Sequence, residues 1–340
     1  MRDTPGLSAS SPSHPPPARL LAYRPGAIGD FILALPALAA LRARFPGASL
    51  TVVGPAAALP LAADLADTLI SADDPRLTPL FAPGPAPLPP KVDPTHAVVW
   101  AGAAEPLVAH LRAAGAVVVH APSRPPAERR QHVADYLVRT LAPLGVSAAE
   151  PAVPRLQPSA DARRATAAFL AEHTAPDERP RWVAFHLGSG SPRKNWPTAG
   201  FVAVAEGLAT RGLRPLLVGG PAEEEIIDPA LAALAPLRPA VARDWPLDRL
   251  AALLAACAGY VGADSGITHL AAAVGTPVVA IFGPTDPALW APRGPRVALV
   301  RHPVPCQPCT WAAMWDCPHR ACLTELRPAA VLAAMRDLTP

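Results

Sequence analysis

Residues 20–44 read LLAYRPGAIGDFILALPALAALRAR and predict the first unit of the fold. The opening run, residues 20–23, is short and apolar, as expected for a buried strand, and the two glycines that follow favour a tight turn. Residues 30–44 repeat apolar side chains with helical spacing and contain Pro36, near which we expect the helix to bend. A strand that leads through a glycine turn into a helix is typical of a βαβ unit, so we expect a parallel sheet.

The same alternation continues along the chain and divides it into two halves. Residues 150–158, EPAVPRLQP, lack periodicity and contain three prolines, which indicates a connection between domains. The expected organisation is a disordered tail at residues 1–19, a first Rossmann-like domain at residues 20–152 and a second at residues 153–340. Such domains bind ligands at the carboxyl ends of their strands, so a site in the cleft between them is expected.

Strands and helices alternate in both halves. Further strands are predicted at residues 50–53, 96–100, 116–120, 182–187, 213–218, 259–262 and 278–282. Helices are predicted at residues 104–113, 128–142, 160–173, 198–210, 222–235, 247–257 and 266–274. Residues 83–94, PGPAPLPPKVDP, predict a loop because they are so rich in proline.

The composition excludes several classes of protein. Hydrophobic residues make up 51% of the 340 residues and charged residues 17%, which does not fit a highly charged disordered chain. The net charge of +3 is small and only 5% of the residues are aromatic, so no nucleic-acid partner is expected. We expect a cytoplasmic protein, because no run suits a transmembrane helix and residues 1–19 lack the apolar core of a signal peptide.

Three loops that follow predicted strands contain the residues best suited to catalysis or ligand binding. In the first loop, RPGAIGD at residues 24–30, Asp30 stands at the start of a helix, where the helix dipole stabilises a negative charge. An aspartate at this position is either a group that faces the cleft or a simple helix cap, and the residues alone leave both open.

The second loop, HLGSGSPRKNWP at residues 186–197, gathers hydroxyls, glycines and adjacent cations. Ser189, Ser191 and Lys194 offer what a diphosphate requires, because its oxygens accept hydrogen bonds and its charge is stabilised by a cation. Lys194 is one of only two lysines against 28 arginines, which indicates a need for a compact ammonium group. An exposed basic turn is the alternative.

The third loop follows the strand predicted at residues 259–262 and begins a helix. Its free backbone N–H groups and nearby hydroxyls predict an anion site without a P-loop lysine. The candidate donor-binding residues of this loop are Asp264, Ser265, Gly266, Ile267, Thr268 and His269. Simple caps and a core histidine are the alternatives. Glu225, in a run of carboxylates after another strand, is a further candidate that would bind a ribose, by analogy with dinucleotide folds.

The motifs of dinucleotide-binding dehydrogenases, P-loop NTPases, serine hydrolases and zinc proteases are absent from the sequence. Four blocks, in this order, instead resemble glycosyltransferase family 9, the ADP-heptose:lipopolysaccharide heptosyltransferases. The blocks are RPGAIGDFILALPAL (24–38), HLGSGSPRKNWP (186–197), VGADSGITHLAAAVGTP (261–277) and FGPTDP (282–287). The resemblance implies an α/β fold of GT-B type, with two Rossmann-like parallel-sheet domains that face each other across a cleft. The first domain would bind the acceptor and the second the nucleotide sugar.

By this resemblance the protein would be an inverting glycosyltransferase that needs no cofactor for catalysis. It would move a sugar, heptose from ADP-heptose, onto a lipopolysaccharide core or a related surface glycan. Asp30 would be the general base for the acceptor hydroxyl, and Lys194 would stabilise the leaving diphosphate. Ser189 and Ser191 would contact this diphosphate, and residues 264–269 would hold it. The expected partners are therefore a nucleotide-diphosphate sugar and a lipid-linked or polysaccharide acceptor, and a lipid-linked acceptor would bring the protein to the inner face of the membrane.

Two other functions stay open at this point. One is a non-catalytic protein that binds a sugar nucleotide. The other is a sugar-nucleotide epimerase of similar two-domain plan, for which His186 and His269 are the candidate cleft histidines.

Four of the five cysteines lie close together, with the spacing Cys306-x2-Cys309-x7-Cys317-x4-Cys322. This number and spacing predict a structural metal site, for zinc or another metal that prefers sulfur ligands. Such a site would fix residues 306–322 to the second domain. Free thiols and disulfides are the alternatives, and disulfides fit a reducing compartment poorly.

Overall fold

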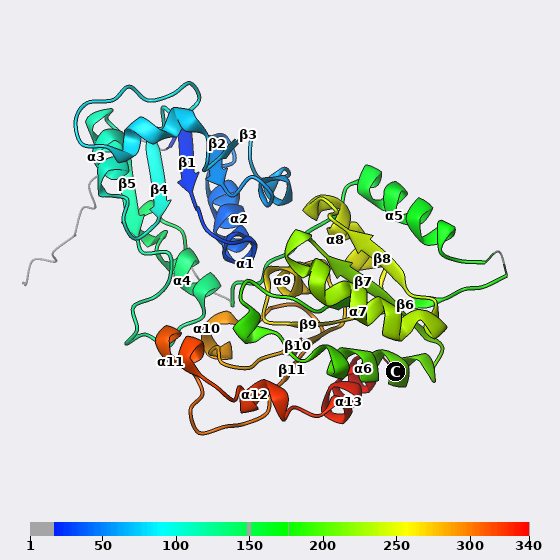
Figure 1. Cartoon of the computed structure of the whole chain (residues 1–340). Helices are drawn as coiled ribbons and strands as arrows, with labels where there is room; N and C mark the ends of the chain where they lie inside the picture. The colour runs from blue at the N-terminus through cyan, green and yellow to red at the C-terminus, as the bar shows by residue number, and fades with distance from the viewer. Residues whose placement is uncertain (1–16, 148–150, 176, 340) are drawn as a thin grey trace, which may run out of the picture.

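The computed structural model describes residues 17–147, 151–175 and 177–339. These residues form two α/β domains, each built on a parallel sheet that is covered by helices (Figure 1). Of the tail predicted at residues 1–19, residues 1–16 lie outside the described residues. The first strand begins at Arg19, one residue earlier than predicted.

The first domain contains a five-stranded parallel sheet in the order β3-β2-β1-β4-β5. The apolar run at residues 20–23 belongs to the central strand of this sheet. In that strand, Leu21 lies opposite Thr51 on one side and Ala97 on the other. The strands are β1 (Arg19–Tyr23), β2 (Ser49–Gly54), β3 (Thr68–Ser71), β4 (His96–Trp100) and β5 (Val117–Ala121). The helices are α1 (Ile28–Ile32), α2 (Leu35–Arg44), α3 (Glu105–Ala113) and α4 (Val133–Arg139), with 3-10 helices η1 (Leu59–Ala62), η2 (Pro75–Phe81) and η3 (Ala142–Leu144).

The single helix predicted at residues 30–44 is two helices. α1 begins at Ile28, so Asp30 lies within its first turn rather than before it. Residues 33 and 34 form a turn, and α2 then starts with Pro36 in its first turn. A proline is accommodated there because the first N–H groups of a helix have no partner within it. The bend expected near Pro36 is therefore a break just before it.

The second domain contains a six-stranded parallel sheet in the order β11-β10-β9-β6-β7-β8. Its strands are β6 (Arg181–His186), β7 (Leu213–Gly219), β8 (Ala240–Arg243), β9 (Gly259–Ala263), β10 (Val278–Ile281) and β11 (Val297–Val300). Its longer helices are α5 (Ala160–Glu172), α6 (Thr198–Ala209), α7 (Glu224–Leu234), α8 (Leu247–Ala256), α9 (Gly266–Ala273) and α13 (Pro328–Leu338). The short ones are α10 (Pro287–Trp290), α11 (Trp311–Asp316), α12 (Ala321–Thr324), η4 (Pro192–Lys194), η5 (Pro221–Glu223) and η6 (Ala235–Leu237).

The two domains meet where α1, which follows β1, lies against α9, which follows β9 (Figure 1). Gly29 and Gly266 approach so closely that a Cβ on Gly266 would lie 2.9 Å from the Gly29 nitrogen. The Arg293 guanidinium adds a second connection, with hydrogen bonds of 2.6 and 2.7 Å to the Asp135 carboxylate in α4. The carboxyl ends of the central strands in both sheets therefore face the same boundary. Within the described ranges, no helix has the length and apolar character needed to cross a membrane.

Candidate active site between the two domains

A cavity of about 760 Å³ lies at this boundary. Its volume is within the range of small-molecule sites, which is roughly 300–1,000 Å³. Residues 27–29, directly before Asp30, line it from the first domain. The loops that follow β6, β7, β8 and β9 line it from the second domain. Loops at the carboxyl ends of both sheets thus share one cavity, which is where the fold predicts a ligand.

Asp30 lies in the first turn of α1, where both of its carboxylate oxygens are held. Oδ1 accepts a hydrogen bond from the Arg24 guanidinium at 3.2 Å, and Oδ2 accepts one from the Ala27 N–H, also at 3.2 Å. The helix N-terminus and the guanidinium both stabilise a negative charge here. The side chain is still 29% exposed, so it stays accessible to a substrate.

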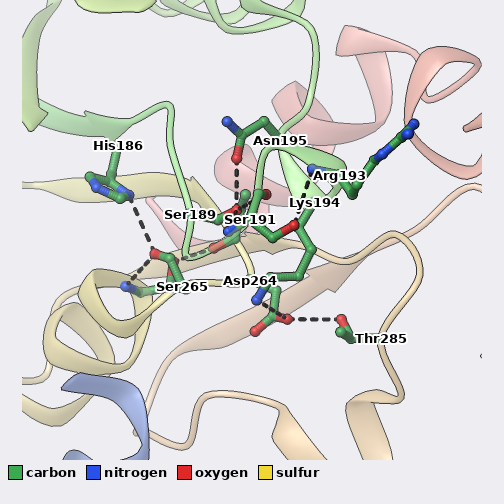
Figure 2. Close-up of polar contacts among 11 residues, drawn as sticks. His186, Ser189, Ser191, Arg193, Lys194, Asn195, Asp264, Ser265 and Thr285 are labelled. Carbon is green, nitrogen blue, oxygen red and sulfur yellow. Dashed lines mark hydrogen bonds and ion pairs between the residues drawn. The ribbon is translucent and has the colours of Figure 1, made fainter. Parts of the chain in front are cut away.

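Lys194, at the end of η4, pairs with Asp264 at the end of β9 (Figure 2). Its Nζ lies 3.1 Å from Asp264 Oδ2, and the Thr285 hydroxyl donates to the same oxygen at 2.9 Å. The two charged side chains are only 19% and 10% exposed, so bulk water screens the pair weakly. Neither residue lines the cavity itself, but Asp264 is followed directly by Ser265, which does.

The two serines of the second loop occupy different places. Ser189 lines the cavity, and its Oγ lies 2.6 Å from the Ser191 carbonyl oxygen and 2.7 Å from Asn195 Oδ1 (Figure 2). Ser191 is buried, and its Oγ accepts the Arg193 N–H at the start of η4. The Ser191 hydroxyl thus caps η4, and Ser189 is the serine that lines the cavity, so the ligand contact of Ser191 stays a prediction.

The start of α9 forms one wall of the cavity through Ser265, Gly266 and Ile267. Ser265 caps the helix, because its Oγ accepts the Thr268 N–H at 3.4 Å. The N-terminus of this eight-residue helix therefore presents its partial positive charge to the cavity, as an anion requires. Thr268 is buried and its hydroxyl donates to the Ala263 carbonyl, so the predicted ligand contact of this residue stays a prediction.

His186, at the end of β6, connects two of the cavity walls. Its Nδ1 lies 3.3 Å from Ser265 Oγ, and its Nε2 lies 3.8 Å from Glu223 Oε1. Burial lowers the pKa of His186 to about 4, so the ring is neutral at pH 7. This neutral histidine therefore lies between Ser265, which caps α9, and Glu223, and it does not supply a positive charge.

His269 lies on α9 and interacts electrostatically with charged groups of both domains. Burial lowers its pKa to about 4, and the remaining influences on its pKa come from Asp264 and Lys194 of the second domain, from Asp30 of the first, and from His132. Its Nδ1 has no hydrogen-bond partner among the residues that the structure describes. The predicted base and the predicted diphosphate site therefore lie near one buried side chain at the domain boundary.

The carboxylate that lines the cavity after β7 is Glu223, whereas Glu225, the residue that the sequence analysis predicted, does not line it. Glu223 is buried, lines the cavity and accepts the Gly220 N–H at 2.8 Å, whereas Glu225 lies exposed in the first turn of α7. A signal for Glu223 was present in the sequence. A glutamate three residues after a loop residue is the spacing of a capping box, which turns the side chain back toward the loop.

Beyond Glu223 the cavity has an apolar wall that the sequence analysis did not predict. The loop after β8 contributes Trp245 and, next to it, Asp244, whose φ of 54° is in the left-handed region. An apolar wall that contains an aromatic ring suits a nucleobase. The other apolar lining residues here are Val218, Ala242, Leu247 and Leu250.

The clustered cysteines lie beside the loops of the second domain. All four are free thiols. The Cys309 N–H donates to the Pro284 carbonyl at 2.8 Å, and the Arg193 side chain donates to the Cys317 carbonyl at 3.2 Å. In the part of the chain that the structure describes, no three His, Cys, Asp or Glu side chains are grouped so that they could hold a metal ion. A metal at residues 306–322 stays a prediction of the sequence, which elemental analysis of the purified protein can test.

The sequence model of glycosyltransferase family 9 (heptosyltransferase) matches residues 97–313, well over half of the chain. The chain belongs to this family. Lipopolysaccharide heptosyltransferase 2 of Escherichia coli K12 is 33% identical over 129 residues, which is 36% of this chain and 37% of that protein. Lipooligosaccharide heptosyltransferase 2 of Haemophilus ducreyi is 32% identical over 158 residues, which is 44% of this chain and 45% of that protein. The matched stretches thus span less than half of these two relatives.

Solved structures of glycosyltransferase family 9 share the fold over nearly the whole chain. The family 9 protein of Veillonella parvula gives a TM-score of 0.77 at 21% identity, over 95% of this chain and 97% of that one. The E. coli ADP-heptose lipopolysaccharide heptosyltransferase II gives a TM-score of 0.71 at 21% identity, over 94% and 98%. These structures confirm the predicted GT-B fold, and the family match confirms the resemblance seen in the four sequence blocks.

Proposed function

We propose that this glycosyltransferase family 9 protein transfers heptose from ADP-heptose to a hydroxyl of a lipopolysaccharide core or a related surface glycan. One observation carries the proposal: Asp30 of the first domain and Lys194 of the second both lie near His269, beside a cavity that both domains line. The heptose and the lipopolysaccharide come from the names of curated relatives, which are lipopolysaccharide heptosyltransferases. A lipid-linked acceptor would bring the enzyme to the inner face of the membrane.

The second domain offers the groups that a nucleotide-diphosphate sugar needs. We place the diphosphate at the N-terminus of α9, near Ser189 and Lys194, and the nucleoside against Glu223 and Trp245. When the sugar leaves, the diphosphate gains negative charge, which the helix N-terminus and the ammonium group stabilise. The hydrogen bond and ion pair to Asp264 hold the ammonium group in position for this step.

The first domain offers the base. As the acceptor oxygen forms its bond to the anomeric carbon, the bond from that carbon to the diphosphate oxygen breaks, and the acceptor proton passes to the Asp30 carboxylate. The base and the diphosphate site belong to opposite domains, and in the proposed step the acceptor attacks from the side opposite the leaving group, which inverts the configuration at the anomeric carbon. Asp30 takes the acceptor proton and groups of the second domain stabilise the diphosphate, so the proposed mechanism uses no cofactor.

A nucleotide screen followed by a transfer assay tests this function. We expect ADP to raise the melting temperature by several degrees at about 100 times its dissociation constant, and GDP and UDP to raise it less. ADP-heptose and a lipopolysaccharide-core acceptor should then give a product with inverted anomeric configuration. Binding of ADP without transfer would favour the non-catalytic protein, and an epimerised donor sugar would favour the epimerase; either result contradicts the proposal.

Glu223 and Glu225 form a matched pair for the nucleoside site. We expect Glu223→Gln to weaken ADP binding by roughly 10- to 100-fold, because hydrogen bonds to a charged group contribute about 1.5–3 kcal/mol. Glu225→Gln should change ADP binding less than twofold, since Glu225 is exposed outside the cavity. Titration calorimetry with ADP measures both. Equal effects of the two substitutions would show that Glu223 does not contact the nucleoside.

A further inference from the structure

Arg24, at the end of β1, is a cation in an unusual position. Its side chain is 2% exposed and is among the largest fully buried side chains of the described chain. Moving a charge out of water is costly unless partners compensate for the lost hydration. Three oxygens accept hydrogen bonds from the guanidinium: Pro25 O at 3.1 Å, Asp30 Oδ1 at 3.2 Å and Ser123 O at 3.4 Å. Its Nε is buried without a partner among the described residues.

The loop after β1 is shaped around the Arg24–Asp30 pair. Gly26 has a φ of 121°, and a Cβ there would lie 3.2 Å from Asp30 Oδ2 and 3.7 Å from Arg24 Nη1. The glycine therefore lets the backbone pass close to both charged groups. Asp30 is the single carboxylate that pairs with Arg24 in the described part of the chain. The buried cation is thus matched to the residue to which we assign the base function.

We propose that Arg24 is a positioning residue that orients the Asp30 carboxylate toward the cleft. The proposal rests on the proposed function of Asp30 as the base. Arg24 holds one carboxylate oxygen at 3.2 Å while the Ala27 N–H holds the other, so the carboxylate cannot rotate freely.

Other charged groups also face Asp30 and are kept constant in the test. His269 on α9 is electrostatically coupled to Asp30, and it is coupled in turn to Lys194, Asp264 and His132. Burial lowers the pKa of His269 to about 4, so the ring stays neutral at the pH where transfer is measured. Arg24 is therefore the charged group in hydrogen-bonding contact with Asp30 among the described residues.

The test compares Arg24→Gln with Arg42→Gln in the full-length protein. Arg42 is a matched control, because its guanidinium also binds one aspartate, Asp67, and two carbonyl oxygens, and it lies outside the cavity. Rates of transfer are measured at one fixed pH with saturating donor. In Arg24→Gln we expect kcat to fall about 10- to 100-fold, because the carboxylate is no longer held in one orientation, while KM for the acceptor changes less than about threefold. Arg42→Gln should leave kcat within about twofold, and both variants should bind ADP within about threefold of the unsubstituted protein.

The split between kcat and KM follows from the place of Arg24. In the proposal it acts through Asp30 rather than on a substrate, so its loss lowers kcat and leaves KM nearly unchanged. A folded Arg24→Gln variant with an unchanged kcat overturns the proposal. If Asp30→Asn also keeps its activity, the proposed function fails as well; if Asp30→Asn is inactive, only the assignment of Arg24 fails.

A second substitution covers the case in which Arg24→Gln does not fold. Arg24→Lys keeps the positive charge but cannot reproduce the forked hydrogen bonds of a guanidinium. We expect kcat to fall about tenfold while KM for the acceptor stays within about threefold, because the carboxylate is poorly oriented although a positive charge remains beside it. Arg24→Lys with an unchanged kcat contradicts the positioning role.

Discussion

Asparagine in place of Asp30 should lower kcat for sugar transfer by a factor of ~10²–10⁴ while the affinity for ADP changes less than about threefold. The amide cannot take the proton of the acceptor hydroxyl, so the step in which this proton moves loses its base. The asparagine oxygen can still accept the Ala27 N–H, so the start of α1 is retained. Steady-state kinetics of transfer and calorimetry with ADP measure the two quantities separately.

The control for this substitution is Asp74→Asn. Asp74 also accepts a backbone N–H, from Arg76 at 2.9 Å, and it also pairs with an arginine side chain, but it caps η2 outside the cavity. Its substitution should leave kcat within about twofold. If Asp30→Asn behaves like Asp74→Asn, then Asp30 is only a helix cap and the mechanism proposed above is wrong.

Alanine in place of Lys194 should lower kcat/KM for the donor by a factor of ~10²–10³, through weaker donor binding and slower transfer together. The leaving diphosphate loses its cation, and the Asp264 carboxylate is left largely buried with only the Thr285 hydroxyl donating to the oxygen that Lys194 had paired. An unpaired carboxylate in that place repels the ligand. Calorimetry should find a larger loss of affinity for ADP than for AMP, because AMP lacks the second phosphate.

Lys91, the other lysine of the chain, provides the control. It lies at the opposite end of the first sheet, beside Arg19, Ser49 and Thr68 at the starts of β1, β2 and β3. Lys91→Ala removes the same charge from the protein as Lys194→Ala, so effects of net charge cancel in the comparison. Near-normal donor kinetics in Lys194→Ala, or an equal loss in Lys91→Ala, would exclude a direct contact of Lys194 with the diphosphate.

The sequence predicted the central strands of both sheets because buried parallel strands are continuous apolar runs. Leu20–Tyr23 and Trp182–His186 are examples, and both lie in the middle of their sheets. The strands that it missed, β3, β8 and β11, are edge strands of four residues each that are only partly buried. Such strands owe their conformation to pairing with a neighbour, so their own residues carry little signal.

Because β8 was not predicted, the part of the site that follows it was not predicted either. Trp245 and Asp244 follow that strand directly, so without β8 no loop at the carboxyl edge was expected there. The loops after β1, β6 and β9 were located because glycine, serine and charged residues follow recognisable strands. Within these loops, composition could not tell a hydroxyl that faces the cavity from one that caps a turn. Ser189 and Ser191 have the same chemistry, and only the path of the backbone separates their functions.

The contact between Gly29 and Gly266 fixes how closely α1 and α9 approach at one place. Neither residue has a side chain, so the two backbones come together there, while Arg293 and Asp135 connect the same two domains at a second place. Residues on both sides of the glycine contact line the cavity. The separation of these two walls therefore depends on the absence of two methyl groups.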